Sequence, residues 1–331
     1  MQLNDITKKN SKQEYEILSD KDKKGEERPW RDKKMNTLEL AASYERLGEK
    51  KAFRVSECGT FLEFRRYQED GSLRLNRASF CKVRLCPMCS WRRSLKVYGQ
   101  ISKVMDKAIE EREYRFLFLT LTIQNCEGEE LPIILDKLFY AYKKLALKAK
   151  FKKPVKGWFR ALEVSHNLSE DTYHPHFHVI LMVNKSYFKD QKQYISQAKW
   201  TEMWKECLEV DYNPIVDIRS FKTGDKASTS KSVAEAGKYT VKDNDYLIKN
   251  EDGTINEAMT DSAVKVLDYS LTNRRLVAFG GEMKKIHKNL NLDDTENGDL
   301  VNTDNEEIRE DLNYVIEKYR WNIGYSQYSK F

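Results

Sequence analysis

Four of the six cysteines lie within 32 residues of one another, and this cluster constrains the fold more than any other feature. Cys58, Cys81, Cys86 and Cys89 include a CPMC pair, which places two thiolates at one tight turn. Two further thiolates would complete a tetrahedral four-cysteine zinc site with no open position for catalysis. Reduced buried thiols are the alternative, and a redox CxxC pair would need a βαβ context that is missing here. The spacing therefore predicts structural Zn2+.

The composition is that of a highly charged protein. Charged residues make up 33% of the 331 positions and the formal net charge is +6, which suits a polyanionic partner. Arg92, Arg93 and Lys96 follow the cysteines and could contact DNA phosphates. No apolar run approaches the ~20 residues that span a bilayer, and the N-terminus lacks a signal-like apolar region. We expect a cytoplasmic protein without a membrane partner.

The chain divides into four expected parts. Residues 1–34 are rich in Lys, Asp and Glu and indicate a mobile charged arm. Residues 35–105 form the zinc-binding, DNA-contacting segment, and residues 106–290 form the main catalytic part. Residues 291–331 are a tail that is first acidic and then aromatic.

Strands and helices alternate irregularly through the main part. Hydrophobic patterning predicts strands near 114–125, 157–166, 174–183 and 215–218, and helices near 35–47, 131–148, 189–209 and 232–242. A polar linker at 222–231 precedes the last helix. Strands separated by helices, with one hairpin, indicate an α+β fold whose sheet has helices on one face. The second face would be free to carry a site.

Three of the five histidines stand in HPHFHV, as His174, His176 and His178. Successive side chains alternate faces on a strand, so all three share one face. If residues 167–173 form the hairpin loop, Glu163 lies opposite His176 to within a residue or two. Two imidazoles and a carboxylate can hold a divalent ion and leave positions open for substrate oxygens. These ligands do not distinguish zinc, manganese and magnesium.

A second candidate group is the segment SVAEAGKYTVKDNDY. Glu235, Tyr239 and Lys242 would share one helix face by their spacing of four and three residues. A phenol has a pKa of ~10 and becomes a usable nucleophile when a metal polarises the phosphate and a cation offsets the charge. Glu235 could act as a general base for water. Tyr246 is a competing tyrosine.

Together, these segments resemble the rolling-circle replication initiators of Gram-positive plasmids, a group of the HUH endonuclease superfamily that uses one tyrosine and a glutamate. The resemblance covers roughly residues 36–290. Its segments, in chain order, are CKVRLCPMCSWRR (81–93), FLTLTIQN (118–125), HPHFHVILMV (174–183), EAGKYTVKDNDYL (235–247) and RRLVAFGG (274–281).

The resemblance implies a five-stranded antiparallel sheet of palm-like topology with flanking helices. It implies that His176 and His178 bind Mn2+ or Mg2+, with Glu163 or His174 as third ligand. Tyr239 would cut one strand of origin DNA and hold its 5′ end, and Glu235 would end replication by hydrolysis. The implied partners are single-stranded or hairpin origin DNA, a host helicase and polymerase, and a second copy in a homodimer. Trp200 and Trp204 could stack on unpaired bases, although their spacing is also typical of a core.

Three other functions share some of these features. A single-tyrosine transposase or a relaxase would have the same chemistry on different DNA. A zinc-dependent DNA-binding regulator would bind without cutting. A metallohydrolase would cut without forming a protein–DNA adduct.

Overall fold

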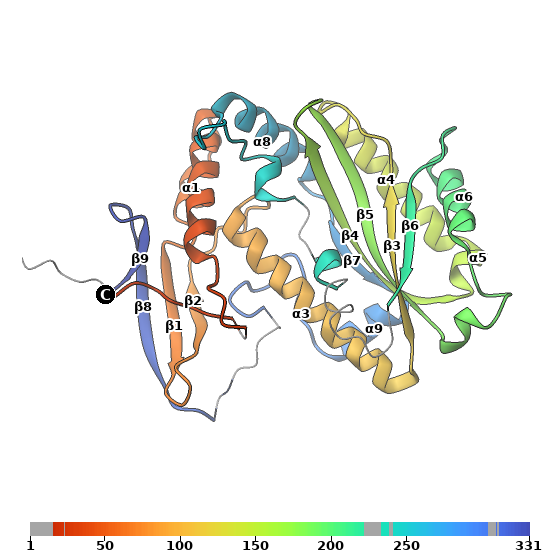
Figure 1. Ribbon diagram of the computed structural model, residues 1–331, viewed down its shortest axis with the longest axis horizontal. Coiled ribbons are helices and arrows are strands. Elements are labelled where there is room, and N and C mark those ends of the chain that lie inside the picture. The colour runs from red at the N-terminus through yellow and green to blue at the C-terminus, as the bar shows by residue number, and fades with distance from the viewer. Residues whose placement is uncertain (1–15, 23, 222–232, 238–240, 304–308, 310) are drawn as a thin grey trace, which may run out of the picture.

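The computed structural model describes residues 16–22, 24–221, 233–237, 241–303, 309 and 311–331 (Figure 1). It contains two antiparallel sheets, of five strands in the order β6-β3-β5-β4-β7 and of four strands in the order β2-β1-β8-β9. The α+β class predicted from the sequence is confirmed. In the parts of the chain that are described, no helix has the length and apolar character needed to cross a membrane.

The five-stranded sheet carries the histidines at its centre. Its strands are β3 (Arg115–Thr122), β4 (Val155–Asn167), β5 (Thr172–Val183), β6 (Val216–Ser220) and β7 (Val277–Gly280). The β4–β5 hairpin turns tightly at residues 168–171, so its loop is shorter than expected. Glu163 pairs with His176 in this hairpin, as the sequence predicts.

One face of this sheet is covered by helices over its whole central part. Apolar residues of β3 and β5 pack there against α4 (Leu131–Leu147) and α6 (Gln197–Leu208), and α8 (Glu257–Leu271) packs against α4. Trp200 and Trp204 of α6 are fully buried in this core, so they do not offer rings to DNA. The i, i+4 spacing of the two rings reflects packing. The short helices α5 (Ala149–Lys152) and η1 (Lys185–Phe188) connect the strands at one end.

The other face is not entirely free, contrary to the sequence expectation. Ile180 and Met182 of β5 pack against α3 (Pro87–Arg112) and α9 (Gly281–Asn289), because the apolar half of that strand face needs a partner. The half that carries the histidines extends beyond this contact. The site therefore lies beside α3.

The four-stranded sheet unites the two ends of the chain. It consists of β1 (Phe61–Tyr67), β2 (Leu73–Ala78), β8 (Tyr314–Asn322) and β9 (Gln327–Lys330), with β8 between β1 and β9. The aromatic tail is therefore an inner part of the cysteine-containing region. Buried Tyr319 and Trp321 alternate with exposed residues along β8, which explains the aromatic composition of the tail.

Two expected boundaries differ from the structure. Helix α1 (Trp30–Arg46) begins inside the expected arm, because the buried Trp30 donates its indole N–H to Asp20 at 2.7 Å. Residues 16–18 also pair with β9. Helix α3 continues through the expected boundary at residue 105, since its apolar stripe packs on the five-stranded sheet. The short α2 (Ala52–Ser56) follows α1.

Candidate metal and catalytic site

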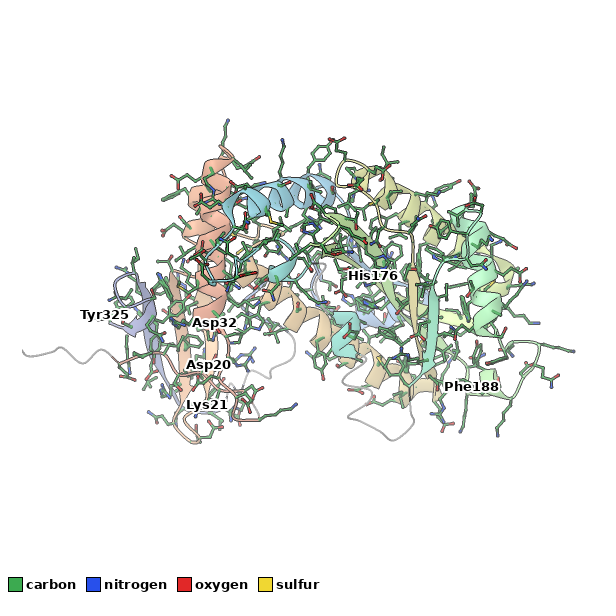
Figure 2. All side chains as sticks on the ribbon, turned by 45° about the horizontal axis from the view of Figure 1, so that its top comes forward. Asp20, Lys21, Asp32, His176, Phe188 and Tyr325 are labelled. Carbon is green, nitrogen blue, oxygen red and sulfur yellow. The ribbon has the colours of Figure 1, made fainter. Side chains whose placement is uncertain are left out.

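Glu163, His176 and His178 come together on the open half of the five-stranded sheet. The three side chains belong to adjacent strands β4 and β5, and each offers one ligand atom within 4.8 Å of the others. Figure 2 places His176 near the middle of the molecule. The alternation of a β-strand and the hairpin register are sufficient to bring these groups together.

The ring nitrogens converge on the carboxylate. Glu163 Oε2 lies 3.0 Å from His178 Nε2 and 3.7 Å from His176 Nε2. The two Nε2 atoms are only 3.2 Å apart. Two N–H groups cannot point at each other at that distance, so at least one nitrogen presents a lone pair. A carboxylate oxygen and imidazole lone pairs are the donor set of a divalent metal ion.

The Nδ1 atoms of His176 and His178, which point away from the cluster, also have polar contacts. His176 Nδ1 lies 3.2 Å from the His174 carbonyl oxygen, which can only accept a hydrogen bond. Nδ1 of His176 therefore carries the hydrogen and Nε2 the lone pair. His178 Nδ1 lies 3.4 Å from Thr120 Oγ1, on the neighbouring strand. Such outer contacts fix the ring orientation of metal-binding histidines, and the residues present fit an ion.

Charged groups from a distant segment meet this cluster. Lys242 Nζ lies 2.9 Å from Glu163 Oε1, and Glu235 Oε1 lies 4.0 Å from His178 Nε2. Burial acts to raise the pKa of Glu163, but the neighbouring His176, His178 and Lys242 outweigh this effect and hold the pKa well below its usual range. The carboxylate is thus ionised at neutral pH.

The segment that contains Glu235 and Lys242 agrees only in part with the predicted helix. Residues 233–237 are helical, but Lys242 has extended backbone and begins the short helix η2 (Asp243–Asp245), where its N–H donates to Asp245. Lys242 therefore reaches the cluster from a loop and does not share a helix face with Glu235. Tyr239 and the linker 222–231 lie outside the described residues.

Tyr246 is excluded as a competing nucleophile. Its ring is fully buried and its hydroxyl donates to the Leu85 carbonyl oxygen. Burial raises the pKa of Tyr246 well above its usual value. A phenol in this setting cannot reach a DNA phosphate.

His174 is separate from the three-residue cluster. Its Nδ1 lies 2.8 Å from Asn125 Oδ1, and the ring lines an open hollow of about 490 Å3 that begins beside His176. Burial and His176 lower the pKa of His174. The remaining lining is uncharged, with Thr122, Ile123, Gln124, Asn125, Tyr212, Asn213, Pro214 and Ile215. The geometry places Glu163, rather than His174, with the histidine pair.

The four cysteines form a second candidate metal centre. All four are buried and reduced, and their ligand atoms lie within 4.8 Å of one another. Cys58 Sγ lies 3.5 Å from Cys86 Sγ and 3.5 Å from Cys89 Sγ, and Cys81 Sγ lies 3.7 Å from Cys89 Sγ. A tetrahedron with metal–sulfur bonds of ~2.3 Å has edges of about 3.8 Å. The sulfur positions therefore fit one tetrahedral ion.

A lysine that the sequence analysis missed lies against this centre. Lys34 is fully buried, and its ammonium donates to the carbonyl oxygens of Ser56 and Cys58 and to Thr60 Oγ1, at 2.6–2.9 Å. Burial lowers the pKa of Lys34, while neighbouring thiols including Cys58 act to raise it. No sequence spacing links Lys34 to the cysteines.

Comparison with known proteins identifies the family. The replication-protein family matches residues 72–329 of the chain. The chain belongs to this family. It is 43% identical to a "Protein rep" of Bacillus amyloliquefaciens, over 96% of this chain and 98% of that protein. It is 42% identical to one of Streptococcus pneumoniae, over 92% and 97%, and 36% identical to one of Lactiplantibacillus plantarum, over 95% and 98%. No solved structure matches.

These matches confirm the recognition of a rolling-circle plasmid replication initiator from the motifs. A role in plasmid replication follows from family membership.

Arg92, Arg93 and Lys96 differ from their expected role in this replication protein. All three are buried in α3, and Arg92 and Arg93 donate to backbone carbonyl oxygens of Leu300, Val301 and Glu296. Lys96 pairs with Asp293 at 2.7 Å. The acidic segment 293–303 folds onto α3 and occupies these cations, so they are not available to phosphates.

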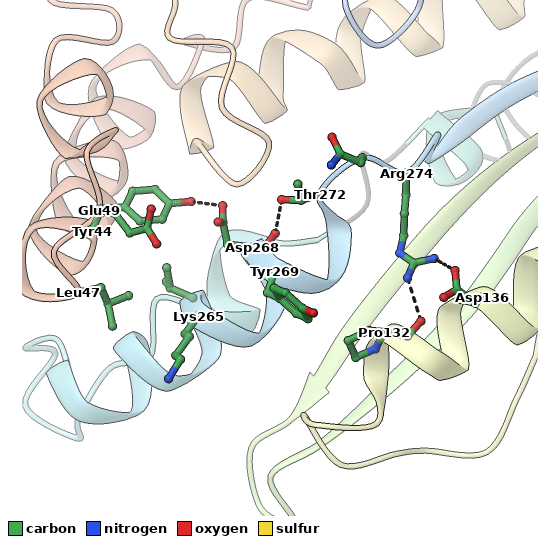
Figure 3. Close-up of a pocket in the computed structure, with 12 residues that line it drawn as sticks. Tyr44, Leu47, Glu49, Pro132, Asp136, Lys265, Asp268, Tyr269, Thr272 and Arg274 are labelled. Atoms are coloured by element: carbon green, nitrogen blue, oxygen red, sulfur yellow. Dashed lines mark hydrogen bonds and ion pairs between the residues drawn. The ribbon is translucent and has the colours of Figure 1, made fainter.

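A larger hollow, of about 690 Å3, lies between α1, α8 and the start of α4 (Figure 3). Several of its polar groups are paired with one another. Tyr44 donates to Asp268 at 2.7 Å, and Arg274 donates to Asp136 and to the Pro132 carbonyl oxygen. Its lining includes neither the Glu163–His176–His178 cluster nor the four cysteines, and the hollow is a gap between packed helices.

Proposed function

We propose that this replication protein nicks one strand of its plasmid origin with Tyr239 and keeps the 5′ end as a phosphotyrosine. The observation that carries the proposal is the convergence of Lys242 and Glu235 on the Glu163–His176–His178 cluster. Both residues flank Tyr239 closely in the chain, at three and four positions. This arrangement supports the HUH-type site that the motifs resemble.

Each residue has a defined part in the reaction. Glu163, His176 and His178 would hold Mn2+ or Mg2+, which withdraws negative charge from the scissile phosphate. The Tyr239 oxygen attacks phosphorus, the bond to the 3′ oxygen breaks, and that oxygen leaves as a 3′-hydroxyl. Lys242 offsets the negative charge that develops during the transfer. The 3′-hydroxyl then primes a host polymerase, with a host helicase opening the duplex.

Glu235 would act at the end of replication. Its carboxylate lies beside His178 and is half-exposed, so water can reach it. It would remove a proton from a water molecule that attacks the phosphotyrosine and releases Tyr239. The uncharged hollow lined by His174 has a volume that could receive an unpaired base of the cut strand. At the four cysteines we propose structural Zn2+, which leaves this ion no part in the chemistry.

The test uses a labelled single-stranded oligonucleotide from the plasmid origin, incubated with the full chain and Mn2+ or Mg2+. We expect a label that migrates with the protein on a denaturing gel. The adduct should disappear in Tyr239→Phe and after chelation. Glu163→Gln, which is nearly isosteric, should slow its formation by about 100-fold or more, as is typical when a charge-stabilising group is lost.

Tyr140→Phe is the matched control, because Tyr140 is an exposed tyrosine on α4, on the opposite face of the sheet. It should nick at the wild-type rate. Cleavage without an adduct would indicate a metallohydrolase, and binding without cleavage would indicate a regulator. Either result would overturn the proposal.

A further inference from the structure

The outer face of the four-stranded sheet carries a row of basic side chains. Alternation along β8 exposes Lys318 and Arg320 on the face opposite the buried Tyr319. In the strand register, Glu63 of β1 stands between Arg77 of β2 and Lys318 of β8. Arg65 lies on the same face of β1, two residues after Glu63. Four cations from three adjacent strands therefore share one surface.

This basic surface, defined by Arg65, Arg77, Lys318 and Arg320, has little charge compensation of its own. Within the described chain, none of these four residues forms an ion pair; the Arg65 Nε–H donates to Asn76. The one carboxylate among them, Glu63, is buried and accepts a hydrogen bond from Asn76 at 2.6 Å. Because four cations on one sheet face have only this buried carboxylate among them, the surface is a distinct positive region.

Aromatic rings lie beneath two of the cations. The Arg65 guanidinium lies 4.7 Å from the Tyr314 ring centroid, and that of Arg320 lies 5.0 Å from the centroid of Phe331. Such cation–π contacts hold the guanidinium groups in place. They also cover ring faces that could otherwise stack on bases. The surface thus presents positive charge to a ligand, and its rings support that charge.

We propose that this basic surface binds the phosphate backbone of duplex DNA. A row of fixed cations suits the backbone, and guanidinium groups already occupy one face of the Tyr314 and Phe331 rings, whereas single-strand binding relies on aromatic stacking. The proposal goes beyond the nicking function, because the surface belongs to the four-stranded sheet and not to the sheet that carries the histidines. His176 lies near the middle of the molecule and Tyr325, in the β8–β9 turn, at its far edge (Figure 2). Duplex beside the nick site would be held here.

The experiment compares two triple variants of the full chain by fluorescence anisotropy. Arg77→Gln/Lys318→Gln/Arg320→Gln removes three exposed cations of the basic surface. Lys137→Gln/Lys143→Gln/Lys150→Gln removes three exposed cations from α4 and α5, on the other sheet, and changes net charge equally. Each protein is titrated with a random-sequence duplex and with one of its single strands, at several salt concentrations.

We expect the first variant to bind duplex at least about 10-fold more weakly, with a salt slope smaller by up to about 2.7, or ~0.9 for each lost phosphate contact. The control variant should bind duplex within about twofold of wild type, as expected when no phosphate contact is lost. Single-strand affinity and oligonucleotide nicking by the first variant should be unchanged, which separates this proposal from the nicking proposal.

Three results would overturn it. Unchanged duplex affinity and slope in the first variant would show that the surface makes no contact. An equal loss in the control variant would assign the effect to net charge. An equal loss of single-strand affinity would show that the surface does not select duplex. The single variant Lys318→Glu, at an exposed position, provides a second test if the triple variant loses its zinc.

Discussion

At the residue scale, Lys34 is placed to support the proposed metal at the cysteines without binding it. Four thiolates around one divalent ion carry a net charge of −2, which is costly to bury. Lys34 places its ammonium against the backbone of Cys58 and Ser56, within the same core. Its positive charge offsets part of the thiolate charge, so the centre and the lysine stabilise each other.

We therefore expect Lys34→Met to weaken metal retention. Removing an outer partner of a metal site typically lowers affinity by about 10–100-fold. Release of zinc to a colorimetric chelator should be faster by a similar factor, while the adduct assay stays active until the zinc is lost. Lys50→Met, at an exposed position after α1, should release zinc at the wild-type rate. Equal rates in all three proteins would contradict the role of Lys34.

Residue patterns predicted well that Glu163, His176 and His178 lie together, and predicted poorly the contacts of the basic residues on α3. Glu163 and His176 are joined by a short hairpin, so strand alternation and loop length predict their pairing. Arg92 and Lys96 are covered by segment 293–303, some 200 positions later in the chain. Periodicity within α3 carries no information about that contact. Local patterns therefore reveal groups brought together by one hairpin, and miss groups buried by a distant segment.

At the element scale, β8 is one of five strands that were not assigned from the sequence, together with β1, β2, β7 and β9. Its aromatic residues indicate a strand, but its partner β1 lies 250 positions earlier and the order β2-β1-β8-β9 cannot be read locally. The strands of the β4–β5 hairpin and helix α4 were predicted nearly at their bounds, since each has strong periodicity. β8 could not be predicted in the same way, because its partner strand is far away in the sequence, whereas β4 pairs with the next strand along the chain.

The contacts that Glu317 of β8 makes with β1 and β9 can be tested through the pH dependence of stability. Arg66 Nε, Lys330 Nζ and the Tyr319 hydroxyl each lie 2.8 Å from its carboxylate. Burial acts to raise the pKa of Glu317, but these partners lower it to about 2. A carboxyl whose pKa is lower in the folded protein stabilises the fold above its unfolded pKa of ~4.3, and this stability is lost as the pH falls toward 2.

Glu317→Gln should lower the free energy of unfolding at pH 7 by about 1–3 kcal/mol, the range for hydrogen bonds to charged groups. The difference from wild type should shrink at pH 3, because the unfolded wild type is then protonated. Urea unfolding at both pH values measures it, and any acid release of metal affects both proteins alike. If the difference in the free energy of unfolding is the same at pH 7 and pH 3, the loss comes from packing and not from the charge of Glu317.

At the scale of the whole molecule, α3 joins the two sheets. Its first turn carries Cys89 next to the N-cap Cys86, and its later residues Val97, Ile101 and Val104 pack in the core of the five-stranded sheet. The 26-residue helix is about 39 Å long. Segment 293–303 lies along the same helix. The cysteine centre is thus mechanically connected to the sheet that carries the histidines.

This connection predicts that metal bound at the cysteines stabilises more than its own sheet. After zinc is removed with a chelator, hydrogen exchange should rise in β1, β2 and β8 and along α3 as far as Val104. Strands β3 and β5 should change less, because the helices of the opposite face still cover them. If faster exchange stops at Ser90, the two sheets are energetically independent and α3 only links them. If exchange rises equally everywhere, the chain is one cooperative unit, and the cysteine centre supports the nicking site directly.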